Sequence, residues 1–332
     1  MKIFVIIVTY NGAPWIRGAL ASLRASIMPC TAVVVDNASG DGTVGIVREE
    51  FPEVILLAKD DNSGFGDGNN AGIRLALDEG ADYIFLLNQD AFVTPPALGL
   101  LVDFLDQHPQ YALATPLHCS PNLQTVDPAT QRGYLQRYAP GYLSDACLGQ
   151  VKPFYDIFGI NAAAWMVRSS AFGVVGGFDP LFFMYGEDDD LMARFAHHRQ
   201  RFALVPASRI VHLRARSARA KVAPLRRLWN QSERPRSELL LGMKLPEGRT
   251  AGKLLRLLAD GVIHPLGRLL VDHQLVEAFS YLLATARVLV QAPTVLRRAR
   301  QCRIPGAHFL DRGVNTSDPH EAGRIAAVRP CE

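Results

Sequence analysis

An alternation of strand-like and helix-like segments in the first ninety residues constrains the fold of this 332-residue chain more than any other feature. Short apolar runs rich in β-branched residues are typical of strands buried on both faces. The stretches between them carry apolar residues at helical spacing. This order predicts an α/β fold with a Rossmann-like, mostly parallel sheet and helices on both faces. The predicted strands are 3–8, 33–35, 54–57 and 83–87, and the predicted helices are 14–25, 43–51 and 69–79.

The end of each predicted strand carries amide and acidic side chains. In an open parallel sheet, ligands bind in the crevice beyond the carboxyl ends of the strands. We therefore expect the four strand ends to line one binding crevice. They are Thr9-Tyr10-Asn11, Asp36-Asn37, the glycine-rich segment Asn62 to Asn70, and Asn88-Gln89-Asp90.

Two common phosphate-binding motifs are missing from these strand ends. A dinucleotide-binding fold places its glycines after the first strand, where this chain has Thr9-Tyr10-Asn11-Gly12. No G-x-x-x-x-G-K-S/T segment occurs, which excludes a P-loop. The glycine-rich segment 62–70 follows the third strand, and by itself it predicts only a flexible turn before the next helix.

Three polar residues at predicted strand ends each have two interpretations. Asp36 either accepts hydrogen bonds from a nucleobase or ribose, or it caps a turn. Asp90 ends a very apolar strand, so its carboxylate either binds a divalent cation that accompanies a diphosphate or caps the following turn. His212 is either a metal ligand or a core histidine.

An acidic run, Glu187-Asp188-Asp189-Asp190, follows the apolar and aromatic segment 182–186. Adjacent carboxylates repel one another and raise one another's pKa. The run is either a solvated helix N-terminus that the helix dipole stabilises, or it holds a carboxylate that acts as a general base beside a dry pocket. Around it we expect a long loop or irregular strands at 115–156, a helix at 189–199, and short strands at 202–205 and 210–212.

Charge divides the chain into two parts. Residues 1–213 contain 14 Lys and Arg against 22 Asp and Glu, a net charge of −8, whereas residues 214–304 contain 18 against 6, a net charge of +12. We therefore predict a first domain at 1–213, a basic amphipathic helical region at 214–304, and a flexible tail at 305–332. Turns of the helical region are expected at its prolines, Pro235, Pro246, Pro265 and Pro293.

Basic amphipathic helices of this kind suit an anionic membrane surface. Alternatively, they form a bundle that packs on the first domain or makes a homodimer. Nucleic acid is not an expected partner, because no nucleic-acid-binding motif accompanies the charge.

Cysteine usage and hydropathy favour a cytoplasmic location. The five cysteines are widely spaced and form no CxxC pair, so neither disulfides nor a zinc site is expected. The apolar N-terminus is very short for a signal peptide and is interpreted as the first strand. The most apolar later stretch, 275–296, contains Glu277, Arg287 and Pro293, so no transmembrane helix is predicted.

Six motifs, taken in order, resemble those of inverting family 2 glycosyltransferases, and most of all those of the rhamnosyltransferase-like branch. Each motif is weak alone, but their order and spacing across residues 2–213 are specific. They are Val8-Thr9-Tyr10-Asn11, Val35-Asp36-Asn37-Ala38-Ser39, Asn62-x-Gly64-Phe65-Gly66-x-Gly68-Asn69, Leu87-Asn88-x-Asp90, Gly176-Gly177-Phe178-Asp179, and Gly186-Glu187-Asp188-x-Asp190-Leu191-x-x-Arg194.

The resemblance implies a GT-A fold that binds a nucleotide-diphospho-sugar donor. Thr9 and Asn11 would then lie against the nucleoside, and Asp36 would hold the base or ribose. The glycine-rich segment would border the base and diphosphate through Asn62, Gly64 and Asn69.

The same resemblance implies the catalytic and metal-binding residues. Asp188, in the pair with Glu187, matches the general base, and Asp190 and Arg194 would brace the helix that carries it. Asp90 matches the last acid of the family's metal-binding DxD motif, and His212 matches a histidine that completes the metal or diphosphate site.

Asn88 departs from the family pattern, because it stands where the DxD motif has its first acid. We count Asn88 with the donor-binding residues. A single acid would hold Mg²⁺ or Mn²⁺ weakly, which leaves much of the coordination to the diphosphate and His212.

The predicted function is transfer of a rhamnose-like sugar to a hydroxyl of a glycan or lipid-linked acceptor in cell-surface polysaccharide synthesis. The enzyme would be cytoplasmic or peripheral at the inner face of the cell membrane. An alternative is a catalytically weak sugar-nucleotide-binding protein, which the altered metal motif favours. A nucleotidyltransferase would carry a basic glycine-rich loop after the first strand, which this chain lacks.

Overall fold

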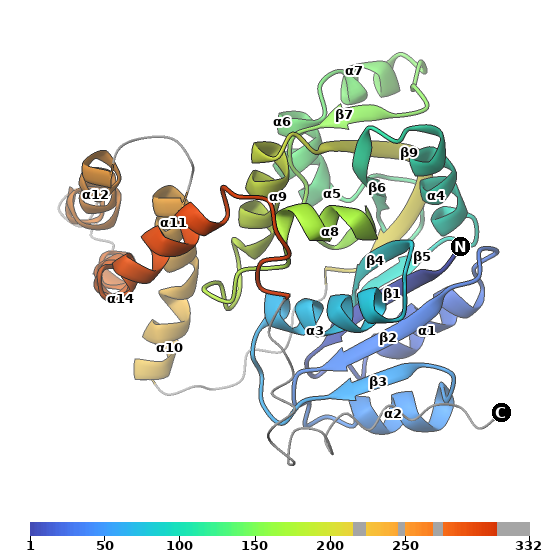
Figure 1. The fold of residues 1–332 in the computed structure, drawn as a ribbon, viewed down its shortest axis with the longest axis horizontal. Coiled ribbons are helices and arrows are strands. Elements are labelled where there is room, and N and C mark those ends of the chain that lie inside the picture. The colour runs from blue at the N-terminus through green and yellow to red at the C-terminus, as the bar shows by residue number, and fades with distance from the viewer. Residues whose placement is uncertain (215–223, 245–249, 268–274, 311–332) are drawn as a thin grey trace.

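A computed structural model describes residues 1–214, 224–244, 250–267 and 275–310. Within these residues, nine strands form one sheet in the order β3-β2-β1-β4-β8-β6-β9-β5, with β7 added on β9. The sheet carries helices on both faces, and a separate group of helices lies to one side of it (Figure 1). The α/β class predicted from the sequence is confirmed.

The first four strands are parallel, as predicted. Continuous runs of Ile, Val and Leu form these strands, and their pairing aligns the polar residue at the end of one with that of the next, as in Thr9 opposite Asp36. The bounds are β1 Ile3–Thr9, β2 Thr31–Asp36, β3 Ile55–Ala58 and β4 Tyr83–Asn88, with α1 Ile16–Arg24, α2 Thr43–Glu50 and α3 Phe65–Asp78 between them.

Helix α3 begins at Phe65, four residues earlier than the predicted start at 69. Gly64 has a φ of +92°, which turns the chain directly before the helix. Gly66 and Gly68 lie in the first turns, where a Cβ atom would meet Phe178 at 2.9 Å and Val8 at 2.7 Å. The glycines therefore allow a helix to pack closely on the sheet, and the expectation of a flexible turn over all of 62–70 was wrong.

The second half of the sheet mixes directions. Strand β8 is antiparallel to both β4 and β6, and β9 is parallel to β6. The bounds are β5 Ala91–Val93, β6 Tyr111–Cys119, β7 Tyr155–Ile157, β8 Ala164–Arg168 and β9 Arg201–His212, with α4 Ala97–Gln107, α8 Ser169–Val175 and α9 Glu187–His197.

Two predictions for this half were wrong. The segments 202–205 and 210–212 belong to one strand, β9, and the pairing with β6 skips from Val205 to Arg209, so a bulge lies between them. The segment 115–156 starts inside β6 and then forms short helices rather than a loop: α5 Pro128–Thr130, a π-helical turn η1 Gln131–Leu135, α6 Gln136–Tyr138 and α7 Tyr142–Cys147.

Two hydrophobic cores lie on the two faces of the sheet. Alternate residues of β1 contribute to each, with Phe4, Ile6 and Val8 in one core and Ile3, Val5 and Ile7 in the other. Helices α3, α8 and α9 cover the first face, and α1, α2 and α4 cover the second. The polar residues at the strand ends belong to neither core, although Thr9 and Asp36 are buried.

The described part of the basic region is helical: α10 Pro224–Gln231, α11 Glu233–Lys244, α12 Thr250–Leu258 and α14 Leu275–Gln301, with a π-helical turn η2 Ala259–Ile263 after α12 and a further helical stretch at 264–267. A third hydrophobic core joins α11, α12 and α14 to Leu181 and Phe182. These two residues belong to the part of the chain that contains the sheet, residues 1–214, which is called the sheet domain below. The turns predicted at Pro235 and Pro293 were wrong, because both lie inside helices, and Pro265 is also helical. Pro235 occupies the first turn of α11, where no backbone donor is lost. Pro246 lies outside the described residues.

Residues 302–310 return from α14 to the sheet domain (Figure 1). The backbone N–H of Gly177 donates to the carbonyl of His308 at 2.8 Å, and the N–H of Gly306 donates to the carbonyl of Val174 at 2.9 Å. Leu310 is buried in the first core. The tail predicted from 305 therefore packs on the fold up to 310, and 311–332 lies outside the described residues.

Helix α14 is long and apolar enough, by length and composition alone, to cross a membrane. Its most apolar window has a mean hydropathy of 1.3, and 28% of that window is buried against the rest of the protein. One such helix is weak evidence for a membrane span, since core helices of soluble proteins also meet the criterion.

Candidate active site

The ends of β1 and β2 form one hydrogen-bonded group around Asp36. The Asp36 carboxylate accepts hydrogen bonds from the Thr9 hydroxyl at 2.8 Å, the Ser39 N–H at 2.8 Å and the Ser39 hydroxyl at 2.5 Å. Asn11 joins the group, because its N–H donates to Ser39 Oγ at 2.8 Å and its Oδ1 accepts from Gly40 N–H at 3.0 Å. Asp36 is buried and Asn11 is exposed, so Asp36 fixes the turn and Asn11 faces solvent.

The glycine-rich segment lies against the loop that precedes the acidic run. Asn62 Oδ1 accepts a hydrogen bond from Gly64 N–H at 3.0 Å, and Asn37 Nδ2 donates to the Gly64 carbonyl at 3.0 Å. A Cβ atom on Gly64 would come within 2.3 Å of the Phe183 carbonyl oxygen. Asn69 is buried and donates to the Phe65 carbonyl of its own helix at 2.9 Å. The segment therefore connects the end of β2 to the residues around Glu187.

Asp90 and His212 lie together at the ends of β4 and β9. The His212 Nε2 atom is 3.5 Å from Asp90 Oδ1, and the N–H of Leu213 donates to the Asp90 carbonyl at 3.0 Å. Two nearby buried atoms, Asn88 Oδ1 and His212 Nδ1, have no hydrogen-bond partner within the described part of the chain. The pairing of β5 with β9 produces this arrangement, because it places Ala91 opposite His212.

A second layer of polar residues lies behind His212. The His118 ring is edge-on to the His212 ring, with centroids 5.8 Å apart. Burial lowers the pKa of His118 to about 3, and its neighbours His212 and Arg214 act in the same direction. The His118 imidazole is therefore neutral, and its Nδ1 is 3.4 Å from Thr130 Oγ1. No motif in the sequence indicated His118.

Arg214 belongs to the same group of polar residues as His118. Its Nε donates to Asp127 Oδ2 at 2.7 Å, and its Nη2 donates to Thr130 Oγ1 at 2.9 Å. Asp127 also accepts from the N–H of Thr130 at 2.8 Å, as an N-cap of α5. Arg214, the first residue of the predicted basic region, is thus an internal partner of an acid 87 residues away.

The acidic run forms the first turn of α9. Glu187 and Asp190 are buried, Asp188 is half-buried and Asp189 is exposed. Burial, and then the charges of Asp188 and Asp189, raise the pKa of Glu187 to about 8. Burial, and then the charge of Asp189, raise the pKa of Asp188 to about 6, although N–H groups of Asp189 and Ala162 bond to its carboxylate and oppose the shift. At neutral pH, Asp188 is mostly ionised and Glu187 mostly holds its proton.

Contacts with neighbours tie these groups to one end of the sheet. The N–H of Tyr10 donates to Gln89 Oε1 at 3.1 Å, which joins the ends of β1 and β4. Burial, and then the charge of Asp188, raise the pKa of Tyr134, whereas the charge of Arg214 lowers it. Tyr134 is therefore close enough to both Asp188 and Arg214 for their charges to act on it.

Asp190 and Arg194 form a buried ion pair one turn apart on α9, with Arg194 Nε 3.0 Å from Asp190 Oδ2. Arg194 also donates to the carbonyls of Val175 at 2.5 Å and Gly177 at 2.7 Å. The side chain therefore fastens α9 to the end of α8.

The donor atoms at the ends of β4 and β9 fit a weakly held divalent cation. Among the described residues, no three His, Cys, Asp or Glu side chains gather closely enough to bind a metal alone. Asp90 offers a carboxylate and His212 an imidazole at one place, beside the unpartnered oxygen of Asn88. Mg²⁺ and Mn²⁺ accept such ligands and take the rest from phosphate and water.

Comparison with known proteins identifies the class of this chain. A sequence model described as glycosyl transferase family 2 matches residues 4–173. The protein belongs to glycosyltransferase family 2, has the GT-A fold, and is a transferase that acts on nucleotide sugars. Family membership favours the enzyme over a binding protein without catalysis.

Individual glycosyltransferases are similar to this chain in sequence or in structure. The chain is 29% identical over 237 residues to the N-acetylglucosaminyl-diphospho-decaprenol L-rhamnosyltransferase of Mycobacterium tuberculosis, an alignment that covers 64% of this chain and 76% of the relative. Among solved structures, it is similar to S. aureus TarS residues 1–349 in complex with UDP-GlcNAc, with a TM-score of 0.54, 17% identity and coverage of 91% and 88%. It is also similar to the mannosyltransferase PcManGT of Pyrobaculum calidifontis in complex with GDP-Man and Mn²⁺, with a TM-score of 0.51, 18% identity and coverage of 98% and 85%.

Proposed function

We propose that the protein transfers a rhamnose-like sugar, with inversion, from a nucleotide-diphospho-sugar to a hydroxyl of a glycan or lipid-linked acceptor. The observation that carries the proposal is the half-buried carboxylate of Asp188 at the head of α9, with a pKa near 6. Such a group is ionised at neutral pH yet still basic enough to accept a proton. The rhamnosyltransferase relative, whose name specifies a diphospho-decaprenol-linked acceptor, supports the choice of sugar and acceptor.

The donor would bind across the ends of β1 to β4. Thr9, Asn11 and Asp36 would contact the nucleoside, since they form one hydrogen-bonded group at the ends of β1 and β2. The diphosphate would lie near the N-terminus of α3, where helix N–H groups favour negative charge. The residues assigned to the base and diphosphate there are Asn62, Gly64 and Asn69. Asn88, at the end of β4, is the remaining donor-binding residue.

In the proposed reaction, Asp188 accepts the proton of the acceptor hydroxyl as its oxygen attacks the anomeric carbon. A new C–O bond forms, the bond from the anomeric carbon to the diphosphate breaks, and the nucleoside diphosphate leaves with the electron pair. Asp90 and His212 would hold Mg²⁺ or Mn²⁺, which supplies positive charge for the departing diphosphate. The mannosyltransferase with Mn²⁺ supports a divalent ion.

The acceptor would approach over the loop directly before α9. Phe183, Met184 and Tyr185 are exposed there, within five residues of Asp188. Exposed aromatic side chains provide flat apolar surface that suits sugar rings or a prenyl chain. This position supports the assignment of Asp188, because a base must contact the attacking hydroxyl.

The experiment compares Asp188→Asn with Asp189→Asn, the adjacent exposed acid. Transfer from a panel of dTDP-, UDP- and GDP-sugars to a lipid-linked GlcNAc acceptor is measured, together with donor binding by calorimetry. Asp188→Asn should lower the rate about 10²- to 10⁴-fold and leave donor affinity unchanged. Asp189→Asn should stay within a few-fold of the wild type. Near-wild-type transfer by Asp188→Asn would exclude this residue as the base.

We propose further that the C-terminal helices hold the enzyme against the anionic cytoplasmic face of a membrane, where a lipid-linked acceptor resides. Exposed apolar side chains of large size are frequent on these helices, and exposed Arg256, Arg297 and Arg300 lie among them. The apolar side chains are Trp229, Leu255, Leu258, Ile263, Leu266, Leu275, Val276, Phe279, Leu289 and Val290.

Sedimentation with vesicles tests this placement. The protein should bind phosphatidylglycerol vesicles and lose binding to phosphatidylcholine vesicles and at high salt. The double change Leu255→Ser and Val290→Ser should weaken binding, whereas Ile27→Ser, a similarly exposed apolar residue on the sheet domain, should not. Binding that is equal for all three proteins, or a homodimer that covers the same residues, would refute the membrane placement.

A further inference from the structure

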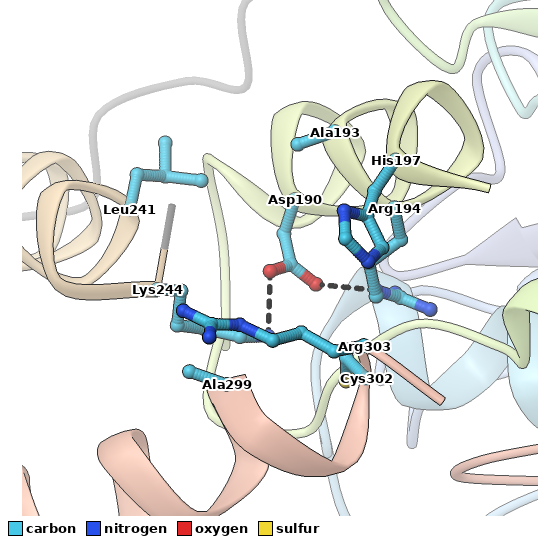
Figure 2. A pocket seen from close by; sticks show the side chains of 9 residues that line it. All are labelled: Asp190, Ala193, Arg194, His197, Leu241, Lys244, Ala299, Cys302 and Arg303. Atoms are coloured by element: carbon cyan, nitrogen blue, oxygen red, sulfur yellow. Dashed lines mark hydrogen bonds and ion pairs between the residues drawn. The ribbon is translucent and has the colours of Figure 1, made fainter. Parts of the chain in front are cut away.

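The strongest feature outside the strand ends is a buried ionic cluster between the sheet domain and the C-terminal helices. Lys244, the last residue of α11, places its Nζ 2.6 Å from Asp179 Oδ2 and 2.5 Å from Asp190 Oδ1. The three side chains are only 4%, 0% and 4% exposed. Figure 2 shows Lys244 pointing from α11 at Asp190, with Arg194 on the other side of the carboxylate. One ammonium group therefore bridges two carboxylates that are 11 residues apart.

Each carboxylate has a second cationic partner. Arg298 of α14 contacts Asp179, and Arg194 pairs with Asp190 at 3.0 Å. Burial alone would raise the pKa of Asp179, but Lys244 and Arg298 outweigh it and lower the pKa. Asp179 is thus held ionised, and each of the two acids has a cationic partner besides Lys244. What Lys244 adds is the link between them.

Helix α11 also holds the chain between these two acids. Arg236 Nη2 donates to the Leu181 carbonyl at 2.9 Å, and Ser237 Oγ donates to the Met184 carbonyl at 3.3 Å. A Cβ atom on Gly186, which has a φ of +80°, would lie 3.1 Å from Ser237 Cβ. Three side chains of one helix therefore fix the start, middle and end of the segment 179–190.

The fixed segment is the one that presents Asp188. Asp179 is its first residue, and Asp190 follows Asp188 by two positions on α9. Lys244 lies outside residues 4–173, the part of the chain that the family model matches. The C-terminal region therefore contributes to the geometry of the acidic run although it lies far from it in sequence.

We propose that Lys244 is a positioning residue for sugar transfer: by bridging Asp179 and Asp190 it sets the position of Asp188 relative to the donor. This inference rests on the proposed function, in which Asp188 is the base. Lys244 itself does not touch substrate. Its effect is on how often the Asp188 carboxylate occupies the place from which it can accept the proton.

The test is Lys244→Met, which keeps the length of the side chain and removes its charge. Because a displacement of a reacting group by about 1 Å costs about 100-fold, kcat should fall about 10- to 100-fold. The KM for the donor and the affinity for the nucleoside diphosphate should stay unchanged, since Lys244 does not contact the group around Asp36. A role in folding alone would instead lower stability and leave kcat per folded molecule as in the wild type.

The matched control is Arg287→Met in the same helical group. Arg287 of α14 pairs with Glu233 of α11 at 2.5 Å, and among the described residues no hydrogen bond or ion pair joins either side chain to the segment 179–190. This variant should melt earlier but keep kcat. If Arg287→Met lowers kcat as much as Lys244→Met, or if Lys244→Met keeps wild-type kcat, the positioning role is refuted.

A charge-matched variant covers the case in which Lys244→Met does not fold. The double variant Asp179→Asn with Lys244→Met removes one anion and one cation, so the net charge of the cluster is unchanged and Arg194 still pairs with Asp190. It should fold and show the same loss of kcat, and wild-type kcat in this variant would refute the bridge. Failure of this inference is distinguishable from failure of the proposed function. If Asp188→Asn is active, Asp188 is not the base and the proposed function fails. If Asp188→Asn is inactive and Lys244→Met is fully active, only the positioning role of Lys244 fails.

Discussion

Replacing Glu187 by Gln should reveal that this buried acid is protonated at neutral pH. Glu187 is 7% exposed, and its Oε2 has no hydrogen-bond partner among the described residues. Burial, and then the charges of Asp188 and Asp189, raise its pKa from 4.5 to about 8. Glutamine has the shape of the protonated acid, so Glu187→Gln should preserve the fold and transfer near pH 7.

The magnitude follows from the two pKa values. Because the folded-state pKa lies above the unfolded value of 4.5, Glu187 contributes stability that is complete below pH 4.5 and lost as the pH rises toward about 8. The difference between the two pKa values, at about 1.4 kcal/mol per pH unit, limits the change in the free energy of unfolding to about 5 kcal/mol. Because Asp188 titrates in the same range and shares the interaction, we expect the free energy of unfolding to change by about 2–4 kcal/mol.

Urea unfolding of the two proteins at about pH 5, 7 and 9 measures the effect. The free energy of unfolding of Glu187→Gln minus that of the wild type should grow with pH and level off above about 8. Glu49→Gln, a change at an exposed position of α2, should show no such growth. A difference that is the same at all three pH values would refute the assignment of a raised pKa to Glu187.

Three further predictions concern the metal, the glycine-rich segment and the base. Asn88→Asp restores the first acid of the metal motif and should tighten Mn²⁺ binding about tenfold in calorimetry with nucleoside diphosphate present, and unchanged affinity would contradict the metal site. Gly64→Ala should cost about 1–3 kcal/mol of stability because of its φ of +92° and the 2.3 Å approach to the Phe183 carbonyl, whereas Gly133→Ala, with open space around it, should cost less in the same thermal unfolding assay. The transfer rate should rise as the pH passes about 6, since Asp188 accepts a proton only when ionised, and a flat profile between about pH 5 and 8 would argue against it.

The parallel half of the fold is predictable because each strand is a continuous apolar run with a polar end. Such an apolar run is stable only when helices cover both faces of the sheet. The polar residue after the run marks the point at which the strand leaves the hydrophobic core. Thr9 opposite Asp36 shows this, because both are the last residues of their strands and bond to each other. Local pattern therefore indicated both the strands and the end of the sheet at which side chains gather.

The second half of the sheet and the C-terminal helices were harder to predict, because their structure depends on contacts between residues far apart in the sequence. Residues 206–208 look like a break between strands, and only pairing with β6 shows that they are a bulge. Pro293 looks like the end of a helix, yet α14 continues through it while packed on α11. His118 carries no motif, and its place behind His212 depends on strand order. Lys244 meets Asp179 across 65 residues, a distance over which no periodicity applies.

The ion bridge of Lys244 has a practical consequence for anyone who wishes to shorten or recombine this enzyme. The change in composition near 214 suggests a place to cut, but a protein that ended there would carry Asp179 and Asp190 without their ammonium partner and would leave Leu181 and Phe182 open to water. Grafting the first 213 residues onto a different C-terminal segment would therefore require that segment to supply a cation and an apolar surface at the same place.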